Sequence, residues 1–262
     1  MEGRKGMNKM KRKIIALFLM ICLVMLPACG SGSEAEDKRE VTFEEIEKLA
    51  ATGVFNVTWS TTEGEYSAGT SYLIDSEKTG GKLLVTAFHY LWPDNAKTFT
   101  GPELPGYVKG GKLFYAQSGK DAGASLKCNL IIPDADAVPN IAKDVAAFTL
   151  KGAEGLATLK LSNRRPEPGE KIYLLARLWD GEVLNDNCVY ECQVVRCSEH
   201  EIVYTLDKKY GSTMGASGGP LVDKYGEVIG MHMAGDNRYY YGHTTESFAK
   251  QIDGGYLSDV TY

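Results

Sequence analysis

The chain has 262 residues, 44% of them hydrophobic, and its 29 basic and 34 acidic residues give a net charge of −5. This length allows one sizeable folded domain preceded by a targeting segment. Without residues 1–28, which hold six of the basic residues and one acidic residue, the net charge is −10. Such an acidic chain is not expected to bind nucleic acid, and it offers no polybasic patch to a membrane surface.

Residues 1–28 are expected to be a signal peptide. Four basic residues, Lys9, Lys11, Arg12 and Lys13, precede thirteen uncharged apolar residues at 14–26, a run too short to span a bilayer as a helix. The segment ends in Leu26-Pro27-Ala28-Cys29, which resembles the lipobox of bacterial lipoproteins. The resemblance implies a lipid on Cys29 and an extracytoplasmic protein anchored to the bacterial cell membrane. Pro27 departs from the usual pattern, so ordinary signal cleavage nearby is the alternative.

Residues 29–40 are small, polar and charged, which predicts a flexible tether before a folded domain at 41–262. Thr42-Phe43-Glu44-Glu45 has the form of a capping box, and Ile46, Leu49 and Ala50 follow at helical spacing before Gly53. These residues predict a short N-terminal helix. Residues 245–252 predict a C-terminal helix, with Phe248 and Ile252 on one face.

Short strands are predicted between these helices. They are expected at 54–59, 66–74, 83–87, 112–116, 146–150, 156–161, 172–179, 188–195 and 202–206, with a further strand at 228–235. Many short strands separated by Gly, Pro and Asp are typical of an all-β sandwich or barrel.

A serine surrounded by glycines lies in Gly215-Ala216-Ser217-Gly218-Gly219-Pro220. Glycine tolerates the backbone of a tight turn and allows main-chain N–H groups to approach a substrate, so the stretch suits a nucleophile. It also fits the Gly-x-Ser-x-Gly motif of α/β-hydrolases. That fold places its Asp and His after the serine, and the 45 residues after Ser217 are too few for the remaining sheet.

Two upstream stretches complete a second pattern. Leu83-Leu84-Val85-Thr86-Ala87-Phe88-His89 ends in a histidine, and Asp144-Val145-Ala146-Ala147 opens an apolar run. With the Ser217 stretch they resemble the His, Asp and Ser motifs of chymotrypsin-fold serine peptidases, in that family's order. The resemblance implies two six-stranded Greek-key β-barrels, at about 54–155 and 160–245, with the active site between them. The N-terminal helix is then expected on the outside of the first barrel.

The family's catalytic roles carry over to these positions. Ser217 would be the nucleophile, His89 its general base, and Asp144 the group that orients the imidazole. The N–H groups of Gly215 and Ser217 would form the oxyanion hole, and neither a metal nor another cofactor is implied. Two residues depart from the pattern: Phe88 replaces a small residue before the histidine, and Ala216 replaces an acidic or amide residue before the serine.

Substrate specificity is expected to depend on His232. Trypsin-like members carry an Asp at the position of Gly211, so a preference for basic side chains is not expected. Residues 228–235 resemble a strand of glutamyl endopeptidases, Ile-Gly-Ile-His-Trp-Gly-Gly, in which His232 would donate to a Glu or Gln side chain. Ser212, Thr213 and Gly235 are the other predicted substrate-binding residues. On a regularly alternating strand His232 and Ala234 face one way, and a core histidine is the alternative reading.

Four cysteines remain after Cys22 leaves with the signal peptide and Cys29 takes the lipid: Cys128, Cys188, Cys192 and Cys197. Cys188 and Cys192 share a strand face but lie too far apart to bond. A Cys192–Cys197 disulfide would require the strand to turn, and free thiols are equally compatible with the spacing. A zinc site using His200 is not expected.

Together these patterns predict a membrane-anchored serine endopeptidase that cleaves peptide or protein substrates through an acyl-enzyme. The main alternative is a weak or inactive protease-fold lipoprotein that binds peptides or wall components. An α/β-hydrolase esterase is a third hypothesis, which the order of the motifs disfavours.

Overall fold

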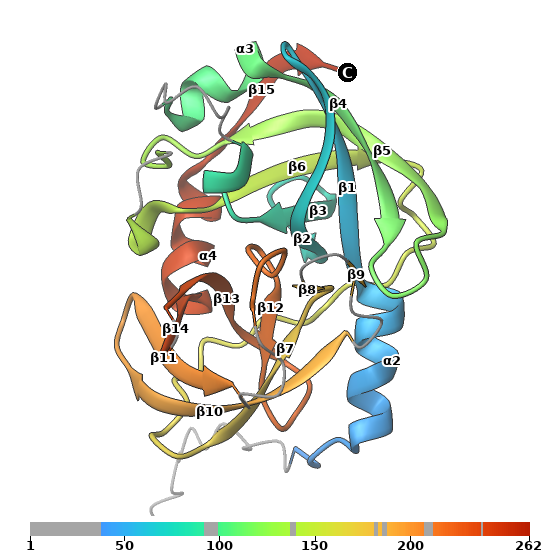
Figure 1. Cartoon of the computed structure of the whole chain (residues 1–262). Helices are drawn as coiled ribbons and strands as arrows, with labels where there is room; N and C mark the ends of the chain where they lie inside the picture. Colours follow the sequence, from blue (N-terminus) through green and yellow to red (C-terminus); the bar gives the residue numbers. More distant parts are fainter. Residues whose placement is uncertain are drawn as a thin grey trace, which may run out of the picture. The chain divides into compact units, whose positions relative to one another are not determined.

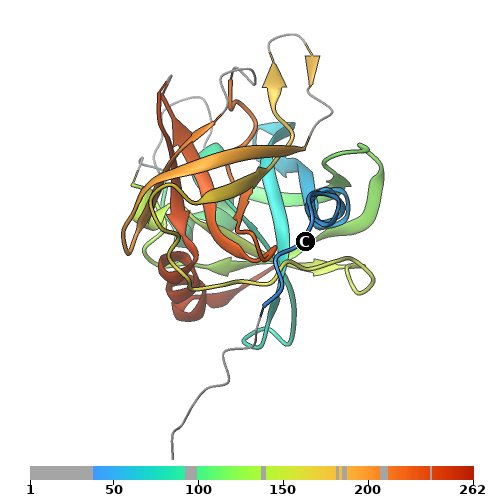
Figure 2. The same cartoon turned by 90° about the horizontal axis from the view of Figure 1, so that it is seen from below.

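The computed structural model describes residues 38–91, 99–136, 140–180, 183–184, 188–206, 212–236 and 238–262. Its folded unit spans Arg39–Tyr262. The predictions for the signal peptide, Cys29, Gly211 and most of the tether lie outside the described residues. Figure 1 shows the order of the elements along the chain, and Figure 2 shows the same structure turned by 90°.

Six strands close the first barrel in the order β5-β4-β1-β2-β3-β6, with β6 pairing back onto β5. They are β1 (Val54–Thr61), β2 (Gly64–Ser76), β3 (Gly81–Thr86), β4 (Val108–Tyr115), β5 (Asp121–Ile131) and β6 (Ala146–Lys151). Alternation along β1 turns the side chains of Val57 and Trp59 into the core. The last strand of the chain, β15 (Tyr256–Thr261), returns to pair with β5.

The second barrel also closes with six strands, in the order β10-β11-β14-β13-β12-β7. They are β7 (Lys171–Leu175), β10 (Val189–Cys197), β11 (Glu201–Leu206), β12 (Pro220–Val222), β13 (Val228–Gly235) and β14 (Tyr240–Thr244). A small hairpin, β8 (Trp179–Asp180) and β9 (Val183–Leu184), follows β7. The strand pairs of both barrels are antiparallel. The prediction of two six-stranded barrels is therefore confirmed, and the α/β-hydrolase alternative is wrong.

Helix α2 (Phe43–Gly53) begins with the predicted capping box, in which Thr42 accepts from the Glu45 N–H and Glu45 accepts from the Thr42 N–H. It contacts β1 and β4 of the first barrel and also β10 of the second. The expected packing on the first barrel is found, and the helix also contacts the second barrel. One apolar face, with Ile46 and Ala50 buried, packs on the core of the first barrel. The ring of Phe43 lies 6.1 Å from that of Tyr173 on β7 and is tilted against it by 55°.

The predicted C-terminal helix is α4 (Thr245–Gly254), with Phe248 and Ile252 buried. The remaining helical segments are short: η1 (His89–Leu91), η2 (Gly101–Glu103), α3 (Leu104–Tyr107) and η3 (Ile141–Lys143). Within the described ranges, no helix has the length and apolar character that crossing a membrane requires.

The segment at 156–161 was predicted to be a strand but forms none. Its backbone groups bond to both barrels instead: the Leu159 N–H donates to Leu73 O at 2.7 Å, and Leu161 makes an isolated bridge with Val228. Leu156 and Leu159 of this segment are buried in the hydrophobic core without belonging to a strand. Conversely, β5 and β14 were not predicted although each pairs with the strand before it in the chain, and β15 was not predicted because its partner β5 lies far away in the sequence.

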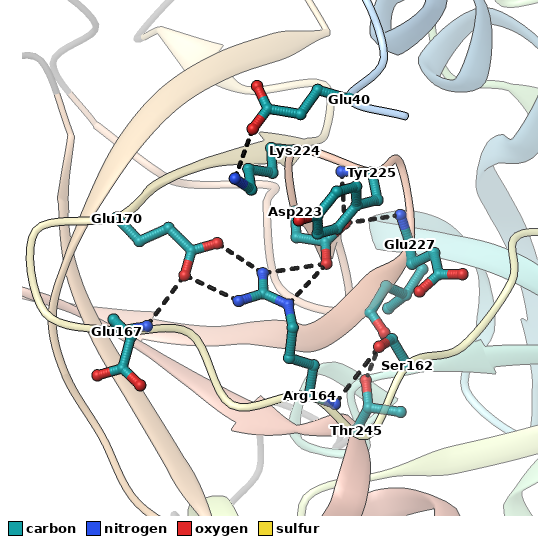
Figure 3. Close-up of polar contacts among 11 residues, drawn as sticks. Glu40, Ser162, Arg164, Glu167, Glu170, Asp223, Lys224, Tyr225, Glu227 and Thr245 are labelled. Atoms are coloured by element: carbon teal, nitrogen blue, oxygen red, sulfur yellow. Dashed lines mark hydrogen bonds and ion pairs between the residues drawn. The ribbon is translucent and has the colours of Figure 1, made fainter. Parts of the chain in front are cut away.

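A polar cluster fixes the linker between the barrels (Figure 3). The Arg164 guanidinium donates to both carboxylate oxygens of Glu170, at 2.5 and 2.9 Å, and to Asp223 Oδ2, at 3.0 and 3.1 Å. Asp223 is fully buried, and its Oδ1 accepts from the N–H groups of Tyr225 and Glu227. The cluster joins the linker to the turn between β12 and β13, directly after the Ser217 stretch.

The four described cysteines form no disulfide with one another, and Cys128, Cys188 and Cys192 are buried. Burial raises the pKa of the half-buried Cys197 to about 11, so this thiol stays protonated at neutral pH. The Cys192–Cys197 disulfide that the spacing left open is therefore not formed.

Candidate active site

Three side chains from distant parts of the sequence meet between the two barrels. His89 opens η1 just after β3, Asp144 precedes β6, and Ser217 lies in the turn before β12. His89 Nδ1 lies 2.6 Å from Asp144 Oδ2, and His89 Nε2 lies 2.9 Å from Ser217 Oγ. A carboxylate only accepts hydrogen bonds, so Nδ1 carries the proton and Nε2 is left to accept from the serine hydroxyl.

Burial differs across the three residues. Asp144 is 4% exposed, and its second oxygen accepts from the His89 backbone N–H at 2.8 Å. The carboxylate is therefore satisfied and orients both the ring and the main chain of His89. His89 keeps 29% of its side chain exposed, and Ser217 is half-buried. The base and the hydroxyl are accessible, whereas the orienting carboxylate is not.

The turn around Ser217 uses glycine at two positive φ angles. Gly215 has φ 92°, and the Ala216 N–H donates to Thr213 O at 2.9 Å, so Gly215 takes the third position of a tight turn that favours glycine. Gly218 has φ 86°, and a Cβ there would lie 2.1 Å from Thr70 O. Within the described part of the chain, the N–H groups of Gly215 and Ser217 donate to no other group. Both are therefore available to an incoming oxygen.

Both departures from the family pattern are accommodated by packing. Phe88 is fully buried in the core of the first barrel, edge-on to Phe99 at 5.2 Å. Ala216 is fully buried in the core of the second barrel. Neither one disturbs the hydrogen bonds of His89 or Ser217.

His232 lies on β13 beside this turn and is 1% exposed. Its Nδ1 lies 2.5 Å from the hydroxyl of Tyr204 on β11, a partner that the sequence did not reveal. Burial, with a smaller contribution from His89, lowers the pKa of His232 to about 3, so the ring is neutral at pH 7. Met231 and Met233 are buried as well while Ala234 is exposed, because a bulge interrupts β13 between His232 and Ala234. The predicted alternation is therefore wrong.

The other predicted substrate-binding residues have different surroundings. A Cβ on Gly235 would meet the Tyr240 ring at 2.3 Å and Thr213 Oγ1 at 3.4 Å, so Thr213 and Gly235 are neighbours. The ring of Tyr240 lies 6.3 Å from that of His232. Ser212 has a local role, since its hydroxyl accepts from the Met214 N–H at 3.0 Å.

A cavity of about 300 Å³ borders Gly215, and its described walls include none of Ser212, Thr213, His232 and Gly235. It is therefore distinct from the His232 region. Strands β1, β2 and β4 supply most of its walls, which are formed by Asn56, Thr58, Ser67, Ala68, Gly69, Phe114, Tyr115, Gly119 and Arg177 in addition to Gly215.

Comparison with known proteins agrees with this architecture. Residues 69–231, more than half of the chain, match the family model described as a trypsin-like peptidase domain. The Rv3671c protease from M. tuberculosis in its active form has 14% identity and a TM-score of 0.55, with 82% of this chain and 85% of that chain covered. The inactive form of Rv3671c protease has 13% identity and a TM-score of 0.52, with 80% and 91% covered. No curated protein matches the chain. At these identities the two structures establish the fold, and the family match establishes the membership: the chain belongs to the family of trypsin-like peptidase domains.

Proposed function

We propose that this protein is a serine endopeptidase that hydrolyses peptide bonds through an acyl-enzyme on Ser217. The supporting observation is the continuous hydrogen-bonded series Asp144–His89–Ser217, at 2.6 and 2.9 Å, beside two unused N–H groups. A serine hydroxyl is a weak nucleophile at neutral pH and requires a base within hydrogen-bond distance, which His89 Nε2 provides.

In the first half of the reaction, Ser217 Oγ bonds to the substrate carbonyl carbon as its proton passes to His89 Nε2. The carbonyl oxygen gains the negative charge and accepts from the N–H groups of Gly215 and Ser217. Asp144 stabilises the imidazolium without taking its proton. The C–N bond then breaks, His89 donates its proton to the leaving amine, and the acyl group remains on Ser217.

Water completes the cycle. His89 Nε2 takes a proton from a water molecule, whose oxygen bonds to the acyl carbon. The C–Oγ bond breaks, the proton returns to Ser217 Oγ, and a carboxylic acid leaves. Donors already oriented toward the developing oxyanion need no rearrangement during either step, which is the largest contribution to such catalysis.

The residue before the cleaved bond is proposed to be Gln in preference to Glu. If Tyr204 donates to His232 Nδ1, the ring proton lies on Nε2 and is available to a substrate oxygen. Because the ring is neutral at pH 7, it suits an amide oxygen better than a carboxylate, whose buried charge would need a cation. Thr213 and Gly235 would form the adjacent wall.

The cavity that borders Gly215 is proposed to take a side chain after the cleaved bond. Phe114 and Tyr115 contribute aromatic walls, and the hydroxyls of Thr58 and Ser67 are 2.8 Å apart and so bond to each other. An apolar or aromatic side chain fits these walls best.

The protein is also proposed to act outside the cytoplasm, held at the bacterial membrane by a lipid on Cys29. The supporting pattern is the basic and apolar segment that ends in Leu26-Pro27-Ala28-Cys29. The described domain begins within a dozen residues of Cys29, so a tether of this length would keep the peptidase near the membrane surface.

The test of activity is labelling of the purified protein with a fluorophosphonate probe, together with digestion of a peptide library. Ser217→Ala is expected to abolish both labelling and cleavage. His89→Ala is expected to reduce both to a similar residual level, because the members of a triad act as a unit. Ser258→Ala, on β15, is the matched control and should keep full activity. A wild type that neither labels nor cleaves would favour the alternative, a peptide-binding protein without turnover.

A further inference from the structure

The peptide between Gly215 and Ala216 lies between the two peptides that carry the candidate oxyanion donors. The Gly215 N–H belongs to the peptide before it, and the Ser217 N–H to the peptide after it. A peptide unit is planar and rotates as a whole. A rotation of the Gly215–Ala216 peptide would therefore change the direction of one donor N–H group relative to the other.

Both ends of this middle peptide are held. The Ala216 N–H donates to Thr213 O at 2.9 Å within the turn. The Gly215 carbonyl oxygen accepts from Thr70 Oγ1 at 2.8 Å, and Thr70 belongs to β2 of the other barrel. Glycine has no Cβ to resist a rotation of this peptide. The hydrogen bond from Thr70 Oγ1 to the Gly215 carbonyl therefore restrains a rotation that Gly215 itself permits.

Thr70 is itself held firmly. It is fully buried, its N–H donates to Ser217 O at 2.8 Å, and its carbonyl accepts from Thr86 Oγ1 at 2.7 Å. Thr86 also bonds to the hydroxyl of Tyr90, the residue after His89. Thr70 thus contacts the Ser217 turn through two groups and connects it with the strand that leads into His89.

We propose that the Thr70 hydroxyl is a positioning group that orients the oxyanion donors of the Ser217 turn through the Gly215 carbonyl. The inference rests on the proposed function, because it assigns Thr70 a part in the same reaction. Thr70 touches no reacting atom in this mechanism. It acts through the Gly215–Ala216 peptide.

The test uses Thr70→Val, which keeps the β-branched shape and removes the donor, and Thr70→Ser, which keeps the donor. Thr149→Val is the matched control, because it removes a hydroxyl that bonds to Cys128 in the same barrel. For Thr70→Val we expect kcat to fall by about tenfold or more, yet less than the roughly hundredfold or greater loss that follows deletion of an oxyanion donor. KM should change little. Affinity for a peptide aldehyde, whose adduct oxygen occupies the oxyanion position, should fall in parallel with kcat.

Thr70→Ser should retain most of the activity, and Thr149→Val all of it. Wild-type kcat and aldehyde affinity in Thr70→Val would overturn the inference, and so would a change in KM alone or failure of Thr70→Ser to rescue. A lower unfolding temperature with unchanged kinetics would show a merely structural role.

A second measurement separates this inference from the proposed activity. The backbone amide signals of Gly215 and Ser217, followed by NMR, should shift or broaden in Thr70→Val and remain in place in Thr70→Ser. If the wild type showed no Ser217-dependent hydrolysis, the proposed function would be wrong. The amide signals would still test whether Thr70 orients the Ser217 turn. Unchanged amide signals in Thr70→Val would then refute its positioning role.

Discussion

At the scale of single residues, the proposed preference for Gln rests on the surroundings of His232. It is buried, neutral and paired with Tyr204, so it can offer a hydrogen bond but no charge. A buried substrate oxygen left without a donor would cost about 1–3 kcal/mol, which corresponds to roughly one or two powers of ten in selectivity.

We therefore expect a peptide-library profile of the wild type to show Gln immediately before the cut. His232→Ala should lose this preference while it still cleaves small apolar sites. Tyr204→Phe should weaken the preference, because Nδ1 loses the partner that places the proton on Nε2. Identical profiles for the wild type and His232→Ala would show that the histidine is only a core residue.

At the scale of elements, the linker between β6 and β7 carries the cluster that fixes the turn after β12. Arg164 bridges Glu170 and Asp223, and Figure 3 shows both carboxylates directed at its guanidinium. Asp223 is fully buried, whereas 32% of the Arg164 side chain is exposed. A buried carboxylate with this set of donors stabilises the fold mainly because its removal leaves them unsatisfied.

Asp223→Ala is expected to destabilise the protein by about 3 kcal/mol, because two backbone N–H groups and part of Arg164 lose their acceptor. Urea denaturation measures the change. Glu246→Gln weakens the partly exposed Arg165–Glu246 pair and serves as the control, with little expected effect. Equal midpoints for Asp223→Ala and the wild type would contradict this account of the cluster.

At the scale of the whole molecule, two buried histidines make stability depend on pH. Burial lowers the pKa of both His232 and His243 to about 3, from an ordinary value of 6.5. Below pH 6.5 the two rings therefore bind protons in the unfolded chain but not in the folded protein, down to about pH 3. Their contribution is complete above pH 6.5 and is lost as the pH falls toward 3.

The expected result is an unfolding midpoint that decreases from pH 7 to pH 5, a window above the range in which carboxylates protonate. Unfolding at pH 5 should take up close to two additional protons, one for each ring. In His243→Gln the slope should be about half that of the wild type. A midpoint independent of pH across this window would show that the rings are protonated in the folded state.

The location of the molecule has its own test. If Cys29 carries the lipid, Cys29→Ser should leave the membrane fraction or accumulate as an uncleaved precursor, because two acyl chains anchor firmly where one is marginal. Fractionation followed by mass determination of the N-terminus measures both outcomes. Correctly cleaved Cys29→Ser that stayed with the membrane would point to a partner protein instead.

Some features could be predicted from the sequence because they depend on residues that are close together in it. The capping box at Thr42 and Glu45 and the apolar face of Phe248 and Ile252 are local patterns, and both helices form where the sequence predicts them. The order of the His89, Asp144 and Ser217 motifs along the chain predicted the two-barrel fold. The structure places these three side chains within hydrogen-bond distance.

Other features were decided only by tertiary structure, because they depend on which distant residues meet. Strand β15 forms because β5 offers it an edge, and 156–161 forms no strand because both barrels take its hydrogen bonds. Tyr204 reaches His232 across the second barrel, and Thr70 reaches Gly215 from the first, 145 residues away. No local pattern encodes such pairs, since the partner of each residue is determined by how the strands pair and the barrels close.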